Sequence, residues 1–96
     1  MPSKNHQALD DVVVVEFAAF AAGPCVGKYL ANHGGFVAKI ESSSRPDGFR
    51  AHYPPFKDNK KGLNRSGVFA MNNDGVYSVG INLKSPAGVD IARKLV

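Results

Sequence analysis

Predicted strands alternate with predicted helices along the hydrophobic pattern of this 96-residue chain. Residues 12–17 form a nearly continuous apolar run rich in valine, which is typical of a strand buried on both faces of a parallel sheet. Residues 24–33 then place apolar side chains at helical spacing, with Pro at the start and a Gly pair beyond the end. Residues 36–41 form a second apolar run at once. This order predicts a βαβ unit with a right-handed crossover.

The second half of the chain is less regular. Residues 42–66 are rich in Ser, Pro, Gly, Asn and Lys without a hydrophobic period, which predicts a long loop. Such long loops are uncommon in compact domains, so we expect a ligand or a partner to hold it. The pattern of residues 68–71 predicts a short strand or a helical turn. The pattern of residues 72–75 predicts a turn. Residues 76–83 alternate as a third strand does, and a helix capped by Ser85 follows to Val96.

These elements predict the α/β fold class, as a partial, doubly wound parallel sheet of Rossmann-like type. It would contain the βαβ unit, the long loop over residues 42–66, a third strand and a helix in a single domain over residues 1–96. Residues 1–8 lack hydrophobic periodicity, so we expect them to form a loose lead-in. Because no stop signal closes the last helix, we expect a truncated N-terminal fragment of a larger domain.

Composition narrows the functional classes only slightly. No apolar run approaches the roughly 20 residues that cross a bilayer, and no signal peptide opens the chain, so we expect a cytoplasmic location and no membrane partner. The single cysteine, Cys25, provides no disulfide framework and is expected to be a small packed residue. The histidines have no metal-ligand spacing, so no metal site is expected.

Basic residues are concentrated in residues 39–65, which hold seven Lys or Arg and three acidic residues, or 7 − 3 = +4. The whole chain also has a formal charge of +4, so the remainder sums to zero. A basic segment beside a parallel sheet could meet phosphates, although a solvated surface is the commoner case. No stacking platform or recognition motif accompanies it, so a nucleic-acid partner is not expected.

Nucleotide-binding motifs are incomplete. No G-x-G-x-x-G occurs, and Gly23-x-x-x-Gly27-Lys28 is one residue short of a P-loop. Open parallel sheets nevertheless bind ligands beyond the carboxyl ends of their strands. We therefore expect residues 17–24 and the residues after Ile40 and Leu83 to lie side by side. Small residues in the first segment would admit a ligand, and would equally permit tight packing of strand against helix.

Several strings occur in the order found in a known family. Residues 13–17 (VVVEF), 22–27 (AGPCVG) and 35–41 (GFVAKIE) resemble the opening of the family III CoA-transferases, the family of formyl-CoA transferase and carnitine CoA-transferase. Residues 81–88 (INLKSPAG) are similar to that family's LDLKxPEG segment, and residues 47–50 to its GDxxR turn. The resemblance covers most of the chain.

This resemblance implies an enzyme that transfers CoA between carboxylic acids through an aspartyl anhydride and an enzyme thioester. The family aspartate would lie beyond Val96, so we expect no catalytic residue here and an inactive isolated fragment. The implied substrates are acyl-CoA and a carboxylic acid, with coenzyme A as substrate rather than as a permanently bound cofactor. The implied assembly of the intact protein is an interlocked homodimer or a two-subunit complex.

The resemblance also implies the residues that contact CoA. They are Phe20, Ala21, Ala22, Ser42, Ile81, Asn82, Leu83 and Lys84. Lys84 is expected to meet a phosphate or the ribose. Ala21 replaces a glutamine of formyl-CoA transferase, and Val76-Tyr77 replaces a basic pair. Ser42 replaces an arginine, whose role would fall to Arg45 or Arg50.

The sequence leaves other functions open. The chain could belong to a related acyl-CoA racemase or isomerase, or to a divergent, non-catalytic subunit of a two-subunit transferase. It could also be a stand-alone nucleotide-binding or interaction module that uses the basic loop. The sequence does not identify the acyl donor or acceptor, because the implied family builds acyl specificity from residues that this chain lacks.

Overall fold

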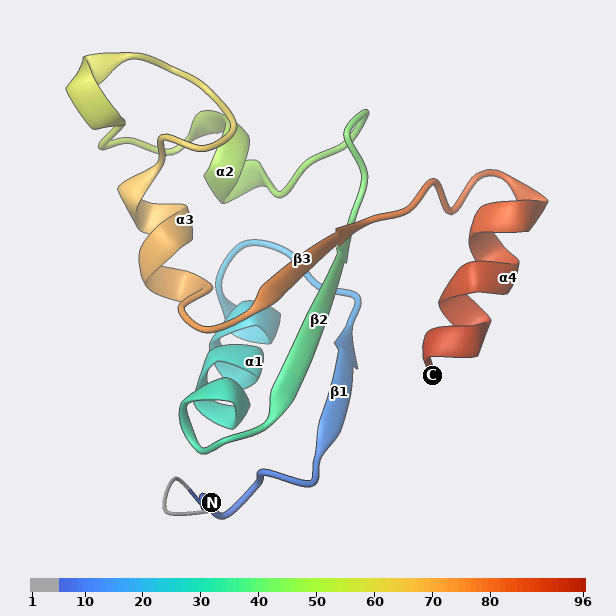
Figure 1. Cartoon of the computed structure of the whole chain (residues 1–96). Helices are drawn as coiled ribbons and strands as arrows, with labels where there is room; N and C mark the ends of the chain where they lie inside the picture. Colours follow the sequence, from blue (N-terminus) through green and yellow to red (C-terminus); the bar gives the residue numbers. More distant parts are fainter. Residues whose placement is uncertain (1–5) are drawn as a thin grey trace.

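A three-stranded parallel sheet organises the computed structural model, which describes residues 6–96 (Figure 1). Its strands are β1 (Val13–Glu16), β2 (Phe36–Glu41) and β3 (Tyr77–Gly80), with β2 in the centre. Val13 is level with Phe36, and Ala38 is level with Tyr77. The parallel α/β fold class is therefore confirmed, and the carboxyl ends of the strands share one edge.

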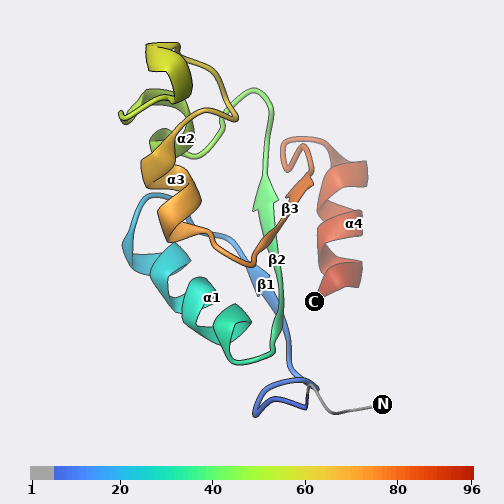
Figure 2. The same ribbon diagram turned by 60° about the vertical axis from the view of Figure 1, so that its left-hand side comes forward.

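Helices lie on both sides of this sheet. Figures 1 and 2 show α1 (Ala22–Asn32) and α3 (Gly67–Asn72) on one face and α4 (Pro86–Leu95) on the opposite side. A short helix α2 (Gly48–His52) and a 3₁₀ turn η2 (Lys57–Asn59) lie in the connection from β2 to α3. None of the helices within residues 6–96 has the length and apolar character needed to span a bilayer.

The core is centred on β2. Val37 is 0% exposed, and Ala38 and Ile40 are also buried, because neighbouring strands and α1 surround them. The prediction that the valine run of residues 12–17 is buried on both faces was wrong. Val13 is 69% exposed, since β1 is an edge strand of the described sheet and its outward face is incompletely covered.

The ends of α1 follow partly from sequence. Gly34 adopts φ 104°, and the N–H groups of Gly34 and Gly35 donate to the carbonyls of Ala31 and Leu30, which confirms the predicted stop. The helix starts at Ala22, two residues before the predicted Pro24. Cys25 is exposed on its first turn, so the prediction of a packed cysteine was wrong.

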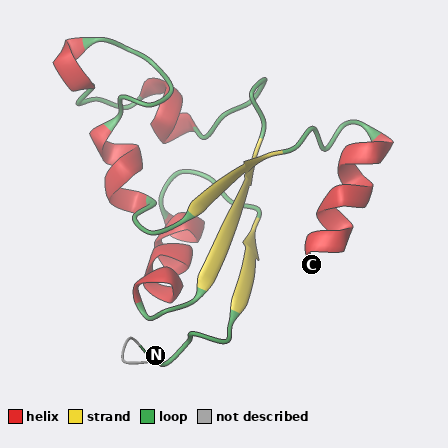
Figure 3. Cartoon of the chain, in the orientation of Figure 1, coloured by secondary structure: helices red, strands yellow, loops and turns green. Residues whose placement is uncertain are grey.

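The segment 42–66 is more ordered than a structureless loop. Asp47 caps α2 by accepting from the N–H of Phe49, and Phe56 pairs with Ser66 in an isolated antiparallel bridge. These local bonds satisfy the backbone where no hydrophobic period exists. Figure 3 shows that loop still separates the short helices. The predicted lead-in of residues 1–8 falls partly on residues 1–5, which lie outside the described residues.

The last two elements refine the predictions for the second half of the chain. The 68–71 stretch is helical and belongs to α3. The third strand ends at Gly80 instead of continuing to Leu83, and the N–H of Ile81 donates to the carbonyl of Glu41 at 2.8 Å. Ser85 caps α4 as predicted, accepting from the N–H of Gly88. Residues 81–84 are consequently a turn that begins where the sheet ends.

Candidate functional site

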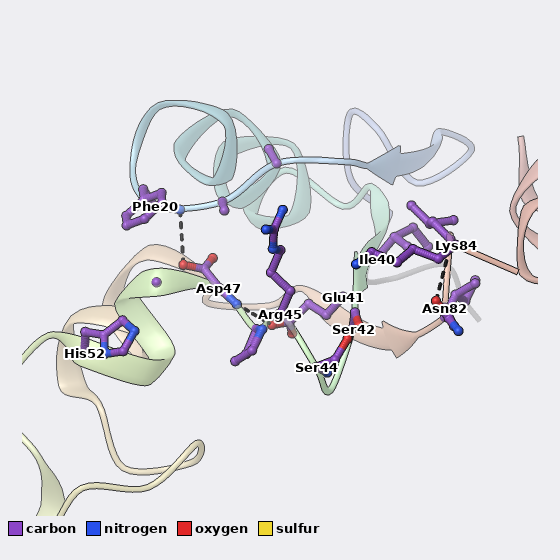
Figure 4. Close-up of a pocket in the computed structure, with 16 residues that line it drawn as sticks. Phe20, Ile40, Glu41, Ser42, Ser44, Arg45, Asp47, His52, Asn82 and Lys84 are labelled. Carbon is purple, nitrogen blue, oxygen red and sulfur yellow. Dashed lines mark hydrogen bonds between the residues drawn. The ribbon is translucent and has the colours of Figure 1, made fainter.

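A cleft of about 620 Å³ lies at the carboxyl ends of the three strands (Figure 4). It is lined by residues 18–20 after β1, by residues at and beyond the end of β2, and by residues 81–84 after β3. The predicted juxtaposition of these three segments is confirmed. It arises because the strands run parallel and in register, so the connections that leave them begin at one edge.

A buried lysine lies beneath the cleft. Lys39 of β2 is 1% exposed, and its Nζ lies 3.0 Å from Glu16 Oε2 and 2.9 Å from Asp47 Oδ2. The same ammonium donates to the carbonyl of Ala18 at 2.9 Å. Buried charges are expensive unless they are paired and hydrogen-bonded, and these contacts meet that requirement for Lys39. The network joins the end of β1 to β2 and to the start of α2.

Phe20 forms part of the cleft wall in a constrained conformation. Its φ of 66° is unfavourable for a bulky residue and costs about 1 kcal/mol or more, so surrounding contacts must maintain it. Its N–H donates to Asp47 Oδ1 at 3.1 Å, and its ring packs edge-on to Phe49 at 5.5 Å between centroids. Gly48 passes so close that an added Cβ would lie 2.3 Å from the Phe20 ring.

Glu41 terminates β2 and is ion-paired. Arg50 donates from Nε to Oε1 at 3.1 Å and from Nη2 to Oε2 at 2.9 Å, while Ser78 Oγ donates to Oε2 at 2.5 Å. Burial opposes the charged form of Glu41, but the Ser78 and Arg50 hydrogen bonds and the Arg50 charge outweigh it and lower the pKa. This carboxylate is therefore a structural anion.

The two arginines near the cleft differ in their contacts. Arg50 also donates to the carbonyl of Leu63 and to Asn64 Oδ1, and its guanidinium lies 3.9 Å from the centroid of the Phe69 ring. Arg45 lines the cleft and, within residues 6–96, its guanidinium makes neither an ion pair nor a hydrogen bond. Of the two arginines that the sequence left open, Arg45 is therefore the one whose donors are free for a ligand.

Lys84 supplies a second cation to the cleft. Its backbone N–H donates to Asn82 Oδ1 at 3.0 Å, which fixes the turn after β3, while its ammonium is without a partner among the described residues. In the view of Figure 4, Arg45 lies between Asp47 and Ile40, and Lys84 lies beside Asn82. The cleft thus has cationic side chains from two of its three lining segments.

Most of the predicted contact residues meet at this cleft. Its lining includes Phe20, Ser42, Ile81, Asn82, Leu83 and Lys84. Ala21 and Ala22 lie at the start of α1 outside the lining, and their contact with CoA stays a prediction. Residues 6–96 contain no group of three His, Cys, Asp or Glu side chains that could hold a metal ion.

Three residues of this region were not among the predicted site residues. His52 lines the cleft, Asp47 is buried at 4% exposure, and Lys39 is buried although its charge was counted with the basic segment of residues 39–65. One signal was present for Lys39. A lysine within an otherwise apolar strand needs a buried counter-ion. The position of Lys39 in residues 36–41 therefore indicated that carboxylates would lie nearby.

The fold and the cleft together define an α/β protein with a cleft at the carboxyl edge of a parallel sheet, and cationic side chains line this cleft. The sequence pattern of CoA-transferase family III matches residues 9–96, and the chain belongs to this family. The resemblance found in the sequence is thereby confirmed.

Individual relatives agree with this assignment. The chain is 36% identical to succinate–glutarate CoA-transferase of Agrobacterium fabrum, covering all of the chain and 24% of the relative. It is 38% identical to (R)-2-hydroxy-4-methylpentanoate CoA-transferase of Clostridioides difficile over 92% of the chain and 22% of that relative. A solved CAIB/BAIF family protein from Brucella suis is 32% identical with a TM-score of 0.79, covering 93% of this chain and 23% of that one. The chain spans about a quarter of the length of these relatives.

Proposed function

We propose that this chain forms the CoA-binding part of an acyl-CoA:carboxylate CoA-transferase. Its membership of family III and the similarity to relatives named as CoA-transferases support this proposal. The observation that carries it is the cleft itself, where Arg45 and Lys84 bring cationic groups without partners among residues 6–96 to the carboxyl edge of the sheet.

The lining suits the chemistry of coenzyme A. The phosphates of CoA are anions that Arg and Lys side chains bind through charge-assisted hydrogen bonds. Ser42 and Asn82 offer polar atoms for the ribose or the adenine. Phe20 and Ile81 present apolar surface against which the base or the pantetheine arm can pack. Each part of the ligand therefore has a complementary group on this chain.

The carboxylates at the cleft do not provide the nucleophile of the proposed reaction. Asp47 accepts from two backbone N–H groups and contacts Lys39, and Glu41 is held by Arg50. In the proposed mechanism the chain binds CoA, and an aspartate outside residues 1–96 forms the anhydride with the acyl group. A second candidate is a non-catalytic CoA-binding module, with which the engagement of both carboxylates is equally compatible.

Further properties complete the proposal. We expect acyl-CoA and a carboxylic acid as substrates, no permanently bound cofactor, and an interlocked homodimer or a two-subunit complex. We also expect a Rossmann-like placement of the nucleotide and a cytoplasmic location. A racemase or isomerase relative would use the same CoA cleft, so assays of acyl transfer and of epimerisation on the longer gene product separate these reactions.

Calorimetric titration with CoA, AMP and inorganic phosphate tests the binding function directly. We expect CoA to bind more tightly than AMP or phosphate, because it occupies the cationic and the apolar parts of the cleft together. Failure of CoA to bind, or equal binding of CoA and inorganic phosphate, would contradict the proposal.

A further inference from the structure

We propose that Lys39 and Asp47 are positioning residues that hold the ligand-facing wall of residues 18–20 in its binding conformation. Neither side chain is offered as a direct ligand of CoA, and the inference rests on the proposed function. Asp47 contributes to the cleft lining, but its side chain is 1% exposed and its oxygens are directed to protein partners.

The contacts fix this wall at both of its ends. Lys39 Nζ donates to the carbonyl of Ala18 at 2.9 Å, and Asp47 Oδ1 accepts from the N–H of Phe20 at 3.1 Å. The ion pair between Lys39 and Asp47, at 2.9 Å, connects the two attachments. One buried unit therefore determines where the backbone of residues 18–20 lies relative to β2.

The conformation of the wall requires such support. Phe20 has a φ of 66°, which a bulky side chain adopts only when its surroundings impose it, and 49% of the residue is still exposed. Its ring packs against Phe49 and Tyr53. Releasing the Phe20 N–H would allow the backbone to return to the favoured region and would move the ring from the cleft.

The charge balance of the network points to positioning rather than to simple stabilisation. Glu16 and Asp47 place two carboxylates around one ammonium. Within residues 6–96, Glu16 Oε1 and Asp47 Oδ2 are buried without a hydrogen-bond partner, and Asp47 Oδ2 has only its ion-pair contact with Lys39. Apolar side chains of similar volume are often as stable as such buried ion pairs, or more so. Apolar groups could not, however, bind the carbonyl of Ala18 and the N–H of Phe20, which is what this network does.

Asp47→Ser tests the inference without removing the helix cap. Serine caps α3 and α4 in this chain, so a serine at position 47 should still accept from the N–H of Phe49. Its shorter side chain would lose the ion pair with Lys39 and the hydrogen bond from the N–H of Phe20. We expect CoA affinity to fall about tenfold and the exchange of the Phe20 amide proton to accelerate by about the same factor. Asp47→Asn keeps an acceptor for both amides but loses the ion pair with Lys39, so it should recover only part of the affinity.

Val37→Ala is the matched control, since Val37 is fully buried on β2 next to α1 and lies outside the cleft. It should lower stability while leaving CoA affinity within about twofold of the wild type. Equal CoA affinity of Asp47→Ser and the wild type would overturn the inference, as would an equal loss of affinity in Val37→Ala. A wild-type protein that fails to bind CoA would overturn the proposed function and this inference with it.

Discussion

The guanidinium of Arg50 binds both carboxylate oxygens of Glu41, at 3.1 and 2.9 Å. This paired geometry connects α2 to the last residue of β2, and the contact of Arg50 with the Phe69 ring extends the connection to α3. Arg50 thereby adds a second attachment of the β2-to-β3 crossover to the sheet, beside the ion pair between Asp47 and Lys39. These attachments explain why a segment with so little hydrophobic pattern has a defined path.

Replacing Arg50 should destabilise the fold strongly. Arg50→Ala leaves the largely buried carboxylate of Glu41 without its cation, and we expect a loss of about 2–4 kcal/mol in the free energy of unfolding. Arg50→Lys should recover only part of this loss, because lysine lacks the planar fork. Urea denaturation measures the effect. Asp58→Asn is the control, since Asp58 forms an exposed pair with Arg65 and should contribute less than about 1 kcal/mol.

Stability should depend on the ionisation of Glu41. Its pKa is lowered in the folded protein, so its contribution is complete above the ordinary glutamate pKa of about 4.3 and is lost as pH falls through the lowered value. Ser78→Ala removes one donor and should raise the pKa of Glu41, which moves this loss to higher pH. NMR titration of the Glu41 carboxyl carbon reports the change. A wild-type pKa at or above the ordinary value would contradict the prediction.

Arg45→Ala and Lys84→Ala should each weaken CoA binding about tenfold, because each removes one charge-assisted contact to the ligand. Added salt should weaken binding to the wild type more than binding to either variant, since the variants retain less electrostatic attraction. Calorimetry at two salt concentrations measures both effects. Lys60→Ala, an exposed change outside the cleft lining, should leave CoA affinity unaltered; a comparable loss there would indicate attraction by net charge alone.

Two glycines provide a matched pair of substitutions. A Cβ at Gly88 would lie 1.9 Å from the carbonyl oxygen of Asn82, so Gly88→Ala must displace the turn that carries Lys84. We expect a loss of about 1–3 kcal/mol in stability together with weaker CoA binding. The Cβ of Gly80→Ala would meet no atom of residues 6–96 within 4 Å, so this variant should change stability by no more than about 0.5 kcal/mol. Thermal unfolding of both variants checks the contrast, and similar unfolding temperatures would contradict it.

The sequence predicted those features that depend on local pattern and on the rules of parallel sheets. The valine run, the Gly34-Gly35 stop and the second apolar run were sufficient for the βαβ unit, and parallel strands then required their carboxyl ends to meet. The path of residues 42–66 was not predictable in this way. Helix α2 has only five residues and depends on the Asp47 cap and on the contacts of Arg50, which are tertiary.

The candidate site, like the fold, could be predicted only in part from the sequence. The rule for parallel sheets brought the segments that contain Phe20 and residues 81–84 to one cleft, as predicted, while their contact with CoA stays a prediction. The resemblance could not choose between Arg45 and Arg50, since only the spatial position of Glu41 shows that Arg50 is occupied. The burial of Asp47 was hidden for the same reason, because its partner Lys39 belongs to another element.

The alternation of charge along β2 has a consequence for strand alignment. Lys39 and Glu41 are two residues apart, so both point to the sheet face that carries Glu16, Asp47 and Arg50. A slip of β2 by one residue would turn both ions toward the opposite face and bring Ala38 and Ile40 against the vacated counter-ions. The misaligned chain would then have unpaired charges on both faces of the sheet, Lys39 and Glu41 on one and their former counter-ions on the other. Electrostatics thus selects a single pairing of the central strand, which the three valines of β1 could not do alone.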